Sequence, residues 1–189
     1  MSQRPLVRLQ VCLMLVLLAL RAASADPPAA KIVPFGQVID EVPGTFLPQG
    51  GRCQANLEVA ELGGYLILDI MRIPKGRHIE PVEDVSGIAW ASKDMLIYTV
   101  SPIYGKPGLF TRSCSTGQTR RIVAPKTVSK AYPDGADYFR LHSVSLKAPG
   151  KIRFYYAPAV DKVDFRHFPS DDFLFEVNFD GSEFRKVPK

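Results

Sequence analysis

The sequence predicts an all-β protein built from antiparallel strands, and three observations support this fold class. The 189 residues include 14 glycines and 16 prolines, which makes turns frequent and long helices unfavourable. Short apolar runs alternate with these turn residues along most of the chain. A pattern of strand, turn and strand then recurs in the second half of the sequence.

Residues 1–25 have the three regions of a secretory signal peptide. A basic start precedes an unbroken apolar run at 11–20, and Ala23-Ser24-Ala25 supplies the small residues that signal peptidase accepts. We therefore expect cleavage between Ala25 and Asp26, with export to a periplasm or to the extracellular space. The apolar run is short for a bilayer, and we expect no membrane span once the signal is removed.

The charge balance gives no support for nucleic-acid binding. Three arginines lie in residues 1–25, so the rest of the chain carries 21 basic and 19 acidic residues. A near-neutral body lacks the basic surface that nucleic acids require. The 46% hydrophobic content is sufficient for one folded domain with its own core.

Two cysteines, Cys53 and Cys114, remain after the signal peptide. An even pair in an oxidising compartment predicts a disulfide, although two separate buried thiols are the alternative. The bridge would close a loop of about 60 residues, worth roughly 4 kcal/mol in the chain-entropy model. Neither cysteine has a second Cys or a His at ligand spacing, so a metal site is not expected there.

Residues 26–49 form a proline-rich, extended lead-in, with a short strand expected near 31–35 or 37–42. Residues 50–189 form a single β domain, which begins with apolar runs at 54–62 and 65–73. The Gly63-Gly64 pair between these runs predicts a hairpin, although a helix over 55–62 is the competing interpretation.

Two groups of four short strands follow, and each strand is bounded by turn residues. Residues 74–84 read as a loop before the first group, and residues 126–137 read as a polar connection with a Pro-Asp-Gly turn before the second. The expected strands are 86–91, 95–100, 108–114 and 118–123, then 139–146, 152–157, 173–178 and 183–187.

The two groups repeat one another. The segment 109–122 can be laid beside 174–187, because each has an apolar strand, a polar turn containing glycine, and a strand with two basic residues. The strand 95–100 takes its place beside 152–157. The basic pairs Arg120-Arg121 and Arg185-Lys186 are typical of outer strands, where charge discourages pairing with another chain.

The run Ser86-Gly87-Ile88-Ala89-Trp90-Ala91-Ser92-Lys93-Asp94 resembles the opening of WD-like β-propeller repeats in bacterial envelope proteins. The segments 108–122 and 173–187 are similar to the third and fourth strands of those repeats, so the likeness covers about 84–124 and 139–188. The resemblance implies two or three propeller-like sheets of four strands. The chain is short for a closed propeller, so an open stack of small sheets, a compact β-sandwich or an oligomer are the alternatives.

Few residues suggest chemistry. Asp161, Asp164 and His167 recur every three residues and are candidate metal ligands, but Lys162 and Arg166 would oppose a cation. A charged, exposed connector is therefore the favoured interpretation, and no cofactor is expected. The adjacent His142 and Ser143 should point to opposite faces of a strand, which excludes a direct nucleophile–base pair.

Aromatic residues suggest binding instead. Tyr155 and Tyr156 are adjacent, so one of them should be exposed, and with Trp90 they are candidates for a binding surface. The sequence thus predicts a secreted or periplasmic, non-enzymatic β-repeat module that binds or scaffolds a protein or glycan of the envelope or extracellular space. A carbohydrate-binding module and a metal-dependent, hydrolase-like enzyme are the alternatives.

Overall fold

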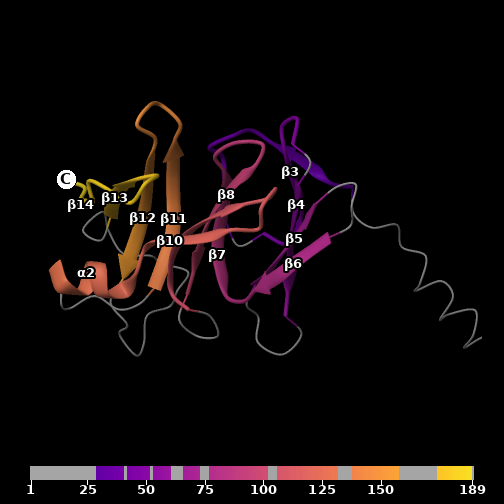
Figure 1. The fold of residues 1–189 in the computed structure, drawn as a ribbon. Coiled ribbons are helices and arrows are strands. Elements are labelled where there is room, and N and C mark those ends of the chain that lie inside the picture. Colours follow the sequence, from indigo (N-terminus) through magenta and orange to yellow (C-terminus); the bar gives the residue numbers. More distant parts are fainter. Residues whose placement is uncertain are drawn as a thin grey trace, which may run out of the picture.

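Three sheets lie side by side in the structure, which is a computed structural model (Figure 1). It describes residues 29–40, 42–51, 53–60, 66–72, 77–101, 106–131, 138–157 and 174–188. Sheet A has the order β1 (Lys31–Val33), β3 (Gly44–Pro48), β4 (Cys53–Val59), β5 (Leu66–Arg72) and β6 (Arg77–Val82). Sheet B has the order β10 (Thr119–Val123), β9 (Gly108–Ser113), β8 (Met95–Val100), β7 (Val85–Trp90) and β2 (Val38–Ile39). Sheet C has the order β11 (Tyr138–Ser145), β12 (Lys151–Ala157), β13 (Leu174–Asn178) and β14 (Arg185–Lys186).

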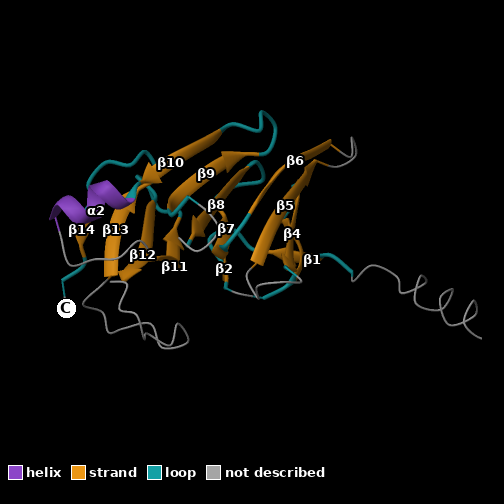
Figure 2. Cartoon of the chain, turned by 90° about the horizontal axis from the view of Figure 1, so that it is seen from below, coloured by secondary structure: helices purple, strands orange, loops and turns teal. Residues whose placement is uncertain are grey.

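The all-β, antiparallel prediction is confirmed. Each sheet contains one meander of four consecutive strands, and every strand pair is antiparallel except the short parallel pair of β1 with β3. The sheets stack in the order A, B, C, so that sheet B is the central layer (Figure 2). This arrangement has three layers, whereas a β-sandwich has two.

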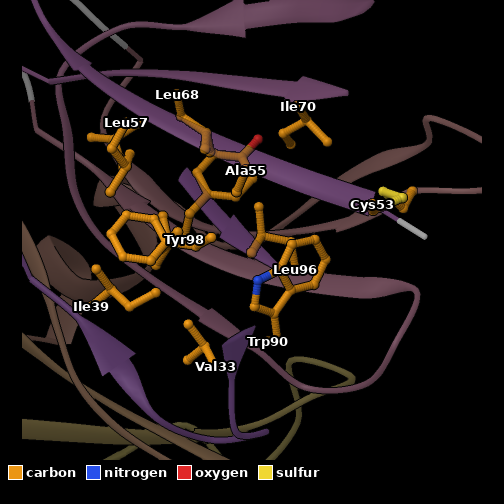
Figure 3. Packing of buried hydrophobic residues seen from close by; sticks show 14 of the residues in the cluster. Val33, Ile39, Cys53, Ala55, Leu57, Leu68, Ile70, Trp90, Leu96 and Tyr98 are labelled. Carbon is orange, nitrogen blue, oxygen red and sulfur yellow. A yellow bond between two sulfur atoms is a disulfide. The ribbon is translucent and has the colours of Figure 1, made fainter. Parts of the chain in front are cut away.

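The first hydrophobic core lies between sheets A and B. Alternate residues of β4 and β5 meet Trp90, Leu96 and Tyr98 of sheet B, and Figure 3 shows these side chains facing one another. The predicted disulfide is present beside this core, where Cys53 in β4 and Cys114 after β9 have Cα atoms 6.1 Å apart. The bridge therefore links sheet A covalently to sheet B.

The second core lies between sheets B and C. Ala89, Ile97 and Leu109 on the other side of sheet B pack against an aromatic cluster of sheet C. Within that cluster, the Phe139 ring lies 5.7 Å from Phe154, centroid to centroid. Both faces of β7 and β8 are consequently buried, which explains the nearly continuous apolar character of these two central strands.

Hydroxyl groups of sheet B bind the free edge of β11 at this junction. Thr99 Oγ1 accepts a hydrogen bond of 3.1 Å from the Leu141 backbone N–H, and the Ser86 hydroxyl donates to the Phe139 carbonyl. The two hydroxyl oxygens lie 3.0 Å apart. β11 is an edge strand, so no neighbouring strand bonds to its outer backbone groups, and this edge is buried against sheet B. The two hydroxyl groups therefore supply the hydrogen bonds that a neighbouring strand would otherwise supply to the β11 backbone.

The proline-rich lead-in crosses from sheet A to sheet B. β1 pairs with β3, and β2 pairs with β7 a few residues later, so the segment joins the two sheets at the N-terminal side. Asp40, directly after β2, then forms a bidentate ion pair with Arg140 of β11, with 2.9 Å between Arg140 Nε and Asp40 Oδ2. One short segment thus contacts all three sheets.

Sheets B and C repeat the same turns. The Cys114 N–H donates to the Asp94 carbonyl at 2.8 Å, and the Phe179 N–H donates to the Gly150 carbonyl at 3.2 Å, in each case just after the third strand of the sheet. Gly117 and Gly181 in the following turns have φ values of 75° and 84°, which glycine adopts without a steric penalty. These bonds match Met95 with Lys151. The repeat alignment from the sequence places Met95 beside Ile152, one residue further along β12. This error of one residue assigns the side chains of β12 to the wrong faces of the sheet.

Two expected connections contain regular structure instead. β6 lies within residues 74–84, which read as a loop because of their polar residues and Pro81. β6 is the edge strand of sheet A, and Pro81 lies where its pairing with β5 shifts register, so the missing N–H is tolerated. Helix α2 (Pro125–Ala131) begins the stretch 126–137, with proline in its favoured first turn. Only Val128 of this helix enters the described core, so its apolar pattern is too short to detect.

Other expectations for the early strands agree with the structure. β1 and β2 fall within the ranges 31–35 and 37–42, where short strands were expected. β4 is a strand that pairs with β5, so the helical interpretation of 55–62 is wrong. Gly63 and Gly64 between them lie outside the described residues.

Candidate functional site

The structure buries two of the three aromatic residues that were predicted to form a binding surface. Trp90 has no exposed surface and lies in the core between sheets A and B. Tyr156 is 1% exposed, and its ring meets Phe139 edge-on at 5.1 Å in the core between sheets B and C. Both belong to the inward positions of their strands, so a surface role for them is a mistaken prediction.

Tyr155, the third candidate, lies on the opposite side of sheet C. Alternate residues of β12, namely Ile152, Phe154 and Tyr156, face sheet B, so Lys151, Arg153 and Tyr155 face the other way. We call this side of the sheet the outer face of sheet C. Tyr155 is half-buried there, and its ring contacts the exposed His142 ring edge-on, with 5.1 Å between centroids.

His142 and Ser143 lie close together, contrary to the sequence argument. The pairing of β11 with β12 shifts register between Leu141 and Ser143, which marks a bulge at His142. The extra residue breaks the strict alternation of side chains, so both side chains lie on the outer face. His142 Nδ1 and Ser143 Oγ are 3.1 Å apart, within hydrogen-bond distance.

Three cations converge on Glu176 of β13 at the centre of the outer face. Its Oε1 accepts hydrogen bonds from Lys151 Nζ at 2.9 Å and from an Nη of Arg185 at 2.8 Å. Its Oε2 accepts one from Arg153 Nε at 2.9 Å. The carboxylate side chain is only 4% exposed, whereas Arg153 is 47% exposed and Arg185 is 61% exposed.

The pKa of Glu176 reflects these partners. Hydrogen bonds from Lys151 and then Arg185, with a smaller contribution from Arg153, lower its pKa to about 2 from the ordinary value of 4.5, against the raising effect of burial. The carboxylate therefore stays ionised at any physiological pH. Among the described residues, one negative charge with three positive charges gives this part of the outer face a positive net charge.

The remaining predicted sites lie outside the described residues. Ala25 and Asp26 of the expected cleavage site belong to this group, as do the candidate metal ligands Asp161, Asp164 and His167. Within the described residues, no group of three or more His, Cys, Asp and Glu side chains could hold a metal ion. A helix long and apolar enough to cross a membrane is also not found among them.

The Glu176 cluster was not predicted, although its elements were visible. Lys151 and Arg153 alternate with apolar residues, a pattern typical of a strand with one exposed face. Glu176 is the one acid in the apolar strand β13, and the sequence around Arg185 indicates only a charge on an edge strand. The missing information was the register, which places Arg153 and Arg185 opposite Glu176 on either side.

Comparison with known proteins does not identify a relative. No family model, curated protein or solved structure matches this chain. The evidence for the function therefore comes from the site itself.

Proposed function

We propose that the chain is an exported, non-enzymatic binding module that docks an acidic component of the cell envelope or extracellular space on the outer face of sheet C. The observation that carries this proposal is the cluster in which Lys151, Arg153 and Arg185 surround one buried carboxylate. Glu176 fixes the positions of the three cations and neutralises only one of their charges. The excess charge is held in place and remains accessible to solvent.

A simple solvated surface would not need this arrangement. Exposed charges of both signs, scattered along the strands, keep a sheet face soluble. Here the cations come from β12 and β14 and meet at a single acid, so their order is set by the fold. Arg140 of β11, which lies at the edge of this face, is instead paired with Asp40.

Export is supported by the signal-like residues 1–25 and by the disulfide between Cys53 and Cys114, which is characteristic of oxidising compartments. We also infer that the three meanders are blades of an open, propeller-like array. Their shared strand order and their stacking support this inference.

The salt concentration at which the protein elutes from an immobilised polyanion tests the proposal. The double variant Arg153→Gln/Arg185→Gln removes two charges from the outer face, and Arg120→Gln/Arg121→Gln removes two charges from β10 of sheet B. Arg120 is the repeat equivalent of Arg185, so the second variant is a matched control. We expect the outer-face variant to elute from an immobilised polyanion at clearly lower salt than both the control and the wild type. Equal elution of the two variants would show that only net charge matters and would overturn the proposal.

A hydrolytic activity is the second candidate, because Ser143 Oγ lies 3.1 Å from a ring nitrogen of His142. A histidine at this distance can act as the base for a serine nucleophile. The test is hydrolysis of p-nitrophenyl acetate by the wild type and by Ser143→Ala, with labelling by a fluorophosphonate as a second readout. Turnover and labelling that disappear in Ser143→Ala would favour this candidate over the binding module.

A further inference from the structure

Two different kinds of side chain adjoin on the outer face of sheet C. Arg153 and Tyr155 lie two residues apart on the same side of β12, which corresponds to about 6.6 Å along a strand. Ser143 is directly opposite Arg153, and the His142 ring lies against Tyr155. An aromatic pair with hydroxyl and imidazole groups thus borders the cationic cluster.

The two arginines retain hydrogen-bond donors for a ligand. A guanidinium group carries five N–H donors, and the described bonds to Glu176 use one nitrogen of Arg153 and one of Arg185. Both side chains are about half exposed. Guanidinium groups with available N–H pairs match the geometry of a planar carboxylate.

We propose that the acidic component is a polysaccharide containing uronic acids. A uronic acid joins an apolar ring face directly to a carboxylate, so one sugar unit can contact the aromatic pair while its carboxylate reaches Arg153. Ser143 and His142 supply hydrogen-bonding groups for the sugar hydroxyls. This inference rests on the proposed function, because it assigns a chemical class to the ligand of the same face.

An acidic peptide fits the face less well. A run of Asp or Glu side chains would use the cations but would gain nothing from Tyr155, since carboxylates have no apolar face to place on a ring. The same applies to inorganic phosphate. The proximity of the aromatic pair to Arg153 is therefore the feature that favours a sugar acid.

Isothermal titration calorimetry with oligogalacturonate tests the inference. The comparison ligands are the fully methyl-esterified oligomer, which keeps the sugar rings and loses the charges, and poly-glutamate, which keeps the charges and lacks the rings. We expect oligogalacturonate to bind more tightly than either. Arg153→Gln/Arg185→Gln should weaken its binding by roughly tenfold or more, whereas the control Arg120→Gln/Arg121→Gln should stay close to the wild type.

Substitution at Tyr155 distinguishes the inference of a uronic-acid ligand from the broader proposal that the outer face binds an acidic component. Tyr155→Ala should weaken oligogalacturonate binding by about fivefold and leave poly-glutamate binding unchanged, while Tyr155→Phe keeps the ring and the affinity. Melting temperatures of both variants verify that the fold is intact. Equal, arginine-dependent binding of poly-glutamate with no effect of Tyr155→Ala would overturn the sugar-acid inference alone. Polyanion binding that does not depend on Arg153 and Arg185 would overturn the proposed function as well.

Discussion

Sheets B and C each contain a meander of four strands with the same order, but one pair of corresponding faces carries different residues. These are the face of sheet B that points toward sheet C and the outer face of sheet C. In sheet B this side packs against sheet C and carries Ile97 and Thr99, both fully buried. In sheet C the equivalent positions carry Arg153 and Tyr155, as the shared turn bonds show. Thr111 of β9 likewise corresponds to Glu176 of β13.

The difference lies in how the stack of sheets ends. The chain does not change its strand order in the last sheet; it changes the residues of one face from apolar and hydroxyl side chains to charged and amphipathic ones. Sheet A ends the stack at the other side in a similar way, with Gln54, Asn56 and Glu58 on its outer side. Terminal repeats with a polar outer face also cap the ends of solenoid repeat proteins. The outer face of sheet C differs because its charges are gathered at one acid.

Exchanging the two equivalent residues tests the comparison most strongly. Ile97→Arg places a charge between sheets B and C, where the native side chain has no exposed surface, and should destabilise the protein by more than about 4 kcal/mol. The reverse change, Arg153→Ile, removes one of the three cations that bind Glu176 and, because Arg153 is half exposed, should cost less than about 1 kcal/mol. Urea unfolding measures both values, and similar costs for the two variants would contradict the different roles of the two faces.

The disulfide is the next largest contribution, since it joins sheets A and B but not sheet C. Cys53→Ser/Cys114→Ser opens a link between residues separated by 61 positions, and the chain-entropy model predicts a loss of about 4 kcal/mol. Thermal unfolding of the oxidised wild type and the double variant measures this loss. A melting temperature within a few degrees of the wild type would show that the link adds little to the packing of the first core.

Glu176 should make the stability of sheet C sensitive to acid. Its pKa of about 2 lies below the unfolded value near 4.5, so its stabilising effect is complete above pH 4.5 and is lost as the pH falls toward 2. The half-exposed arginines are screened by solvent, which leaves an effect of about 2 kcal/mol. Glu176→Gln should lose this amount at pH 7 and flatten the acid limb of the stability curve. Glu58→Gln, an exposed acid of sheet A, is the control and should change stability by less than about 0.5 kcal/mol.

The hydroxyl of Thr99 should give the smallest of these effects. Thr99→Val keeps the shape of the side chain but leaves the buried Leu141 N–H without this acceptor, at a cost of about 1.5 kcal/mol. Thr99→Ser retains the hydroxyl and provides the control for the lost bond. Amide hydrogen exchange at Leu141 measures the effect locally, and unchanged protection in Thr99→Val would contradict the bond's role at the junction of sheets B and C.

Much of the fold could be predicted because local patterns determine it. Apolar runs and turn residues located nearly every strand of sheets B and C, and β8 matches its expected range of 95–100. The disulfide followed from the number of cysteines and the expected compartment. The failures lie where tertiary contacts override local signals, as in β6, which has a proline at a sheet edge, and α2, whose Val128 packs into the second core.

The candidate site depended on information that local patterns do not contain. The bulge at His142 places the His142 and Ser143 side chains on the same face, and the residue types alone do not predict a bulge at this position. Likewise, the meeting of Lys151, Arg153 and Arg185 at Glu176 depends on cross-strand register over three strands. A phase error of one residue, such as the pairing of Met95 with Ile152, is enough to hide which face of β12 is exposed.

The most direct measurement is a map of backbone amide chemical shifts by NMR while oligogalacturonate is added to the disulfide-bonded protein. We expect the perturbed amides to cluster in β12, β13 and β14 around Arg153, Tyr155 and Glu176, with sheet A unchanged. Perturbations centred on sheet A or on β10, or none at saturating oligomer, would contradict the assignment of the outer face of sheet C as the binding surface.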